Sequence, residues 1–135
     1  MTPDLTAAAR RLVAGDSSTH VAAGVVHACE QLTYHLARLV GEVGMRTLLA
    51  RSVALTSARF PWLANTIPNT APVDDPWASL RTALELQDPH AAGEAFVDLL
   101  STFVELLGRL LGEGLAVRLL HEVWPEVFRE VKETT

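Results

Sequence analysis

The sequence predicts an all-α protein with a four-helix-bundle-like core, made of two similar helical hairpins, residues 17–60 and 88–131, and two short flanking helices. Apolar residues recur at helical spacing along most of the chain, and glycines and prolines separate these segments. No segment alternates with the period of two that is typical of a strand. With 135 residues, 49% of them hydrophobic, the chain has the size and composition of one domain, residues 1–135.

The two hairpins are predicted from a phrase that occurs twice. Residues 38–42 are Arg-Leu-Val-Gly-Glu, and 71 positions later residues 109–113 are Arg-Leu-Leu-Gly-Glu. The same offset aligns Ser17 with Asp88, and both suit the N-cap of a long helix. We interpret the glycines as hinges and the glutamates as acids that favour the start of the next helix, rather than as a functional motif. Two such hairpins packed face to face would bury both apolar stripes, although leucine-rich helices ending in glycine can also resemble one another by chance.

The N-terminal half is predicted to contain three helices. The first covers about residues 3–14, between a capped proline and a glycine. The second runs to Val40 and has a core face made of Val21, Val25, Ala28, Cys29, Leu32, Leu36 and Leu39. After a turn over residues 41–44, the third continues until Pro61 ends it, with a stripe made of Met45, Leu48, Leu49, Val53, Thr56 and Phe60.

One long connection follows. Residues 61–76 contain four prolines and show no period, so they are predicted to be the one long loop of the domain. Trp62, Leu63 and Ile67 should hold this loop against the core. A loop of this length is often functional, but it can also simply carry the chain from one hairpin to the next.

The C-terminal half repeats the pattern. A short helix over about residues 76–86 precedes a long one that begins after Asp88 and ends at Gly112. The long helix has a wide apolar arc, made of Phe96, Leu99, Leu100, Phe103, Leu106, Leu107, Leu110 and Leu111. The last helix should cover about residues 114–132, with apolar positions at Leu115, Leu119 and Val123 and a kink or break at Pro125.

Charge and composition exclude several classes of partner. Residues 1–67 hold six basic and four acidic side chains, a net +2, whereas residues 68–135 hold five basic and twelve acidic ones, a net −7. This distribution offers no clustered basic patch, so we expect no nucleic-acid partner. No apolar run is long enough for a membrane span, and with no signal peptide and a single cysteine we expect a cytoplasmic protein. Ten of the eleven basic residues are arginine, which is typical of a GC-rich, bacterial coding sequence.

A metal or ligand site is the alternative hypothesis for function. His27 lies beside the core face of the second helix, and Glu94 and Asp98 lie on an acidic stripe of the long C-terminal helix. If these stripes faced each other, the bundle would hold a His-carboxylate cluster of the kind that binds a transition metal, or would take a small apolar ligand in its interior. The paired Glu-x-x-His motifs of di-iron bundles are missing, so solvated polar faces are the simpler interpretation.

The leading hypothesis is a non-enzymatic helical interaction module that needs no cofactor. The sequence has no phosphate loop, no serine-centred elbow and no zinc spacing, and Cys29 lies on an apolar face, where its thiolate is disfavoured. The wide apolar faces instead favour a homo-oligomer or another protein partner. The candidate contact residues are Trp62, Ile67, Trp77 and Trp124, because exposed aromatic residues dominate many interfaces. Buried residues that cover the bundle ends would be the ordinary alternative for the tryptophans.

Overall fold

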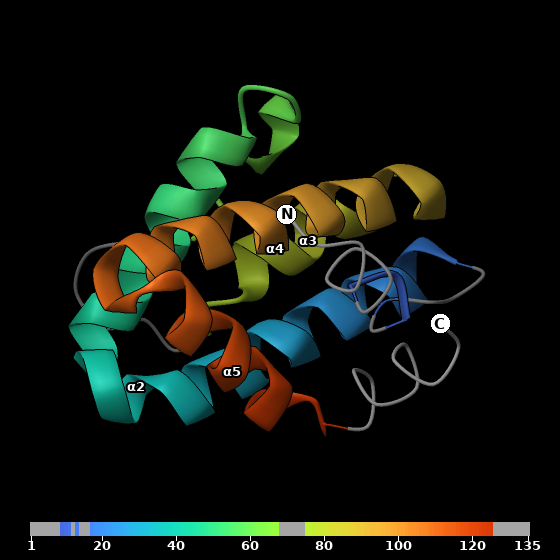
Figure 1. Ribbon diagram of the computed structural model, residues 1–135. Coiled ribbons are helices and arrows are strands. Elements are labelled where there is room, and N and C mark those ends of the chain that lie inside the picture. Colours follow the sequence, from blue (N-terminus) through green and yellow to red (C-terminus); the bar gives the residue numbers. More distant parts are fainter. Residues whose placement is uncertain (1–8, 12, 14–16, 68–74, 126–135) are drawn as a thin grey trace.

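The computed structural model describes residues 9–11, 13, 17–67 and 75–125, and confirms the predicted all-α class (Figure 1). The elements in order are α2 (Ser18–Thr56), the 3-10 helix η1 (Pro61–Leu63), α3 (Ala78–Glu85), α4 (Pro89–Leu111) and α5 (Glu113–Val123). Across these described ranges, every regular element is helical. None of their helices combines the length and apolarity that crossing a membrane requires.

Helix α2 consists of two segments that meet at a sharp corner. Its N-cap is Ser17, whose Oγ accepts a hydrogen bond from the backbone N–H of His20 at 3.2 Å. At Gly41 the backbone takes φ 80° and ψ 161°, a conformation that is essentially restricted to glycine. The predicted turn over residues 41–44 is therefore a corner of one residue, and the second segment, residues 42–56, begins at once.

The corner between α4 and α5 has the same construction. The Asp88 side chain caps α4 by accepting from the N–H of Ala91 at 2.9 Å, and the helix ends at Gly112 with φ 97° and ψ 140°. Caps and corner glycines are both 71 positions apart, so residues 18–40 match α4 in length. The predicted caps and hinges are thus confirmed, while the duplication that would account for them stays a prediction.

The two long helices lie side by side and run in the same direction (Figure 1). Val21 near the start of α2 lines one surface hollow together with Pro89 and Gly93 at the start of α4. The first segment of α2 ends at Gly41 and α4 ends at Gly112, so both corners lie at the same end of the molecule (Figure 1).

A residue just beyond the end of each second helical segment contacts the long helix of the other half. Arg59, just after α2, pairs with Asp98 of α4 at 3.3 Å. The indole N–H of Trp124, just after α5, donates to Oε1 of Gln31 at 2.9 Å, across 93 residues of sequence. These two contacts join the two halves of the chain.

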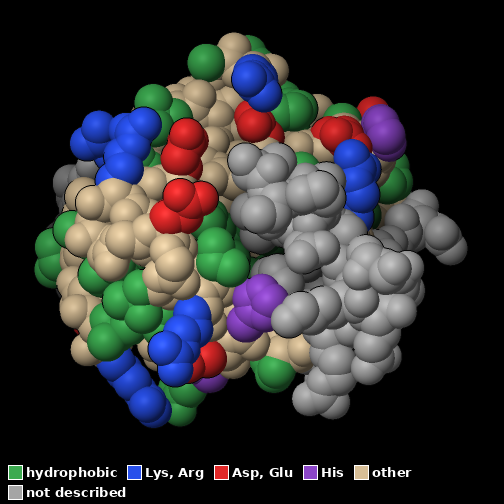
Figure 2. Space-filling view, viewed as in Figure 1, with side chains coloured by type: hydrophobic (Ala, Val, Ile, Leu, Met, Phe, Trp, Pro, Cys, Tyr) green, Lys and Arg blue, Asp and Glu red, His purple; other side chains and the backbone are tan. Residues whose placement is uncertain are grey.

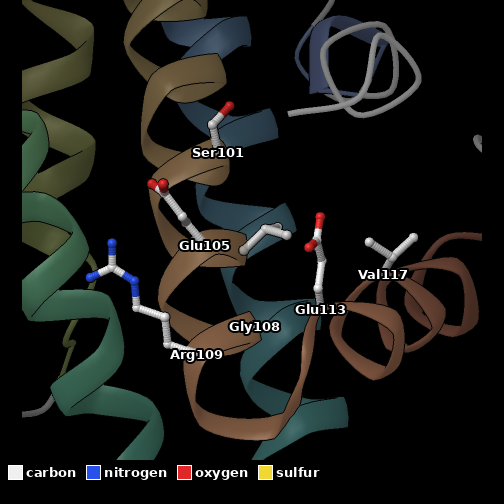
Figure 3. A pocket seen from close by; sticks show the side chains of 7 residues that line it. Ser101, Glu105, Gly108, Arg109, Glu113 and Val117 are labelled. Carbon is white, nitrogen blue, oxygen red and sulfur yellow. The ribbon is translucent and has the colours of Figure 1, made fainter.

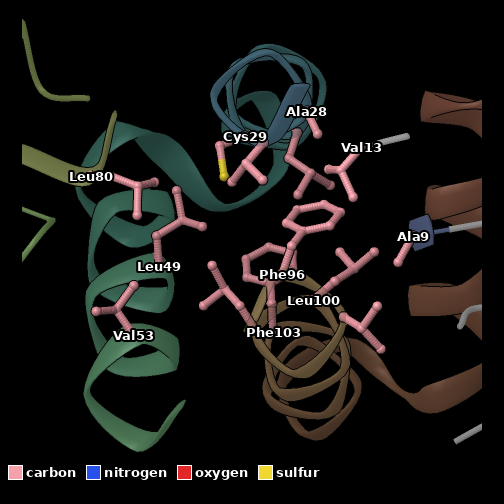
Figure 4. Packing of buried hydrophobic residues seen from close by; sticks show 14 of the residues in the cluster. Ala9, Val13, Ala28, Cys29, Leu49, Val53, Leu80, Phe96, Leu100 and Phe103 are labelled. Atoms are coloured by element: carbon pink, nitrogen blue, oxygen red, sulfur yellow. The ribbon is translucent and has the colours of Figure 1, made fainter. Parts of the chain in front are cut away.

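One hydrophobic core holds these helices together (Figure 4). Phe96 and Phe103 of α4 are fully buried between the segments of α2. The short helix α3 adds Leu80 and Leu84 to the same core, because its apolar side faces α2. The start of the predicted loop packs against the core, as expected: Leu63 and Ile67 are buried, and Trp62 is partly buried.

Several predicted helix ends differ from the structure. The second segment of α2 stops at Thr56 rather than at Phe60, because Ser57 Oγ and its N–H bond back to the last carbonyls and a turn precedes Pro61. Helix α5 ends at Val123, which confirms the break before Pro125. Of the helix predicted over residues 3–14, residues 9–11 are helical; its other residues except Val13, and residues 126–132 of the last predicted helix, lie outside the described residues.

Candidate interaction surface

Large apolar side chains are exposed beside both corners. Leu39 is 58% exposed and Val43 71%, on either side of Gly41; Leu110 is 60% exposed and Leu115 44%, on either side of Gly112. We call these four residues the corner patch. Leu39 and Leu110 occupy the same position in the two copies of the repeated phrase.

This exposure corrects the sequence analysis, which placed Leu39, Leu110 and Leu115 on core-facing stripes. Helical periodicity marks the whole apolar arc as core-facing. In the last turn before each glycine, Val40 and Leu111 pack against the core, whereas Leu39 and Leu110, about 100° further round the helix, are exposed. The core therefore covers a narrower arc of each helix than the apolar spacing indicates.

Charged side chains of both signs surround the corner patch. Arg38 and Glu42 flank the first corner, Arg109 and Glu113 flank the second, and all four are exposed. In the part of the chain that the structure describes, none of the four takes part in an ion pair, although Arg38 lies 6.0 Å from the centre of the Tyr34 ring. Figure 2 shows hydrophobic, basic and acidic side chains interspersed on the side of the molecule where Figure 1 places the corners.

The contact residues predicted from sequence are mostly covered. Trp124 is 4% exposed and Ile67 8%, and both belong to the core. Trp62 and Trp77 are partly buried and pack against the same core, Trp62 with its ring edge-on to that of Phe60. The three tryptophans therefore cover the core and do not form an exposed aromatic patch.

The structure also places the candidate metal ligands. Glu94 pairs with Arg10, and the hydrogen bond from this arginine holds the pKa of the carboxyl below its ordinary value. Asp98 pairs with Arg59, and His27 is exposed on α2. Among the residues described, no group of three or more histidine, cysteine, aspartate or glutamate side chains could hold a metal ion.

A surface hollow of about 410 Å³ lies between α4 and α5 (Figure 3). Charged, polar and apolar residues line it: Ser101, Val104, Glu105, Gly108, Arg109, Glu113 and Val117. In Figure 3 the side chains of Glu105 and Arg109 point away from α5, while Glu113 stands between the two helices. The charged groups therefore do not converge on one point, as they would in a preformed ligand site.

Cys29 is an unreactive core residue. It is buried, and this burial, together with the charge of Glu30, raises the pKa of its thiol to about 12. Because the thiolate is the nucleophile, this environment gives no support to cysteine catalysis.

Comparison with known proteins adds no assignment. No family model, curated protein or solved structure matches this chain. Arguments about function therefore rest on the surface itself. Sequence reasoning missed the corner patch, although the leucine shared by the two repeated phrases was the signal that could have found it.

Proposed function

We propose that this protein is a non-enzymatic helical interaction module that associates with a second copy of itself. The observation that carries the proposal is the corner patch, four large apolar side chains exposed around two matching corners at one end of the fold. Covering such side chains removes apolar area from water, the main favourable contribution to most protein association.

Leu39 and Leu110 are well suited to this role. Each sits in a capped 23-residue helical segment that contributes many buried apolar side chains to the core, so the leucine is presented on a rigid support. Rigid presentation lowers the entropy lost on association. The metal-site hypothesis gains less support, because Glu94 and Asp98 already have arginine partners.

Sedimentation equilibrium tests the proposal. We expect the wild-type chain to dimerise, and the double variant Leu39→Ser/Leu110→Ser to associate at least about two orders of magnitude more weakly, since a dimer would bury four of these leucines, two from each subunit. The matched control is Leu55→Ser/Leu86→Ser, which removes two leucines that are 52% and 79% exposed away from the corners. A wild-type protein that stays monomeric, or a control that loses association equally, would contradict the proposal.

A further inference from the structure

Helices α4 and α5 are joined by a single residue. Helix α4 ends at Leu111 and α5 begins at Glu113, so Gly112 is the whole connection. We infer that the two helices can straighten through Gly112 into one continuous helix, so that two copies of the chain exchange α5. The inference rests on the proposed function and adds how the second copy is held, because the α5 of each chain would take the place of α5 on its partner.

The first support is an apolar stripe that crosses the corner without a change of register. From α4 to just beyond α5, every seventh residue is apolar: Phe96, Phe103, Leu110, Val117 and Trp124. Seven residues make about two helical turns, so these side chains would lie along one side of a continuous helix. A corner requires no such agreement between the helices on either side of it. The pattern is therefore typical of one long helix as well as of the observed hairpin.

The corner at Gly41 lacks this continuity. The same spacing there passes from Leu32 and Leu39 to Arg46, which interrupts the apolar stripe. The segment after Gly41 is also followed by η1 and α3, which pack into the same core, so this segment could not leave alone. We therefore assign the exchange to α5 and not to the second segment of α2.

The second support is the backbone of the hinge. Gly112 has φ 97°, and glycine populates this region about as readily as the helical region, so straightening the hinge costs little. The corner is also tight, because a Cβ on Gly108 would lie only 3.5 Å from Cα of Glu113. Short, tight hinges favour exchange of an element between copies, since they leave the chain few ways to fold back on itself.

The third support is the limited attachment of α5. Its buried residues are Ala116, Leu120 and Val123, and a surface hollow lies on each side of it, one against α4 (Figure 3) and one against α2. An exchanged α5 would bury the same residues against α2 and α4 of the partner, so these contacts would be kept. The two straightened helices would cross where their hinges meet. Leu110, exposed beside the corner, would then lie next to the partner chain, at the end of the molecule that carries the corner patch.

Substitution of the hinge residue tests the inference. Alanine is strained at the positive φ of the corner but favours a helix, so Gly112→Ala should penalise the folded-back chain and favour the straightened one. We expect this variant to dimerise at least about a hundredfold more tightly than the wild type in sedimentation equilibrium. Gly41→Ala introduces the same strain at the other corner, and Gly93→Ala lies inside α4; neither should tighten the dimer.

Spin labels on the otherwise unchanged chain provide a second measurement. The bonded pair Gln31 and Trp124 marks where the far end of α5 meets α2, and exposed His27 and Glu122 lie about one turn or less from that pair. Labels can be attached at His27→Cys and Glu122→Cys, because Cys29 is buried and burial raises the pKa of its thiol to about 12. Two singly labelled preparations, refolded together, give mixed dimers with one label on each chain.

Exchange predicts a short separation between the labels in these mixed dimers. A doubly labelled chain, refolded with excess unlabelled chain, should then show a long separation. The opposite pair of results, or a Gly112→Ala variant that dimerises no more tightly than the wild type, would show that α5 stays on its own chain, while self-association through the corner patch stands. A monomeric wild-type protein would overturn both the exchange and the proposed function.

Discussion

At the scale of single residues, the buried hydroxyl of Thr56 stands out because it lacks a hydrogen-bond partner among the described residues. Its side chain is 1% exposed, and among the described residues Oγ1 has no hydrogen-bond partner. Nearby Ser52, also buried, donates to the Leu48 carbonyl at 2.7 Å. A buried hydroxyl without a partner costs about 1–3 kcal/mol relative to one that is bonded.

Replacing Thr56 with valine should therefore stabilise the fold. Valine keeps the branched shape and removes the polar atom, so we expect the free energy of unfolding to rise by about 1 kcal/mol in urea denaturation. The matched change Ser52→Ala should lower stability, because it removes a hydroxyl that is bonded. Destabilisation by Thr56→Val would show that the hydroxyl is satisfied.

At the scale of elements, the glycine corners determine the course of the chain. A Cβ at Gly41 or Gly112 would meet no atom within 4 Å, so space does not exclude a side chain there. The positive φ values disfavour a side chain at both positions, because residues other than glycine are strained by about 1–3 kcal/mol in that region of φ and ψ.

Alanine substitutions separate this backbone effect from packing. Gly41→Ala and Gly112→Ala should each destabilise the protein by about 1–3 kcal/mol. Gly93→Ala, inside α4 and with equally open space, should stabilise it by up to about 1 kcal/mol, since alanine favours a helix. Thermal or urea unfolding of the three variants gives the comparison, and equal effects at all three glycines would refute the assigned role of the corners.

The sequence predicted these elements better than it predicted their surroundings. Ser17 and Asp88 were recognisable as caps, and Gly41 as a hinge, because such signals act within a few residues. Leu39 lines a hollow beside Leu119 of α5, so its exposure depends on how closely α5 packs there, which periodicity does not record. The bond from Trp124 to Gln31 spans 93 positions and follows from topology, so one sequence could not reveal it.

At the scale of the whole molecule, two halves of similar construction pack around one core. Each half supplies a capped long helix, a glycine corner and a returning helix, and Arg59 and Trp124 tie the halves together. Their corners lie at one end and leave the corner patch exposed. At this scale the function we propose is association through that end, with the interior holding the corners in place.

Native mass spectrometry of the full chain, as purified, tests this central claim most directly. We predict a species with twice the 14.6 kDa chain mass and no added mass from a metal or ligand. The same measurement on Leu39→Ser/Leu110→Ser should shift the protein to the monomer. A wild-type monomer that carries a stoichiometric metal ion or small molecule would contradict the account and favour a ligand-binding bundle instead.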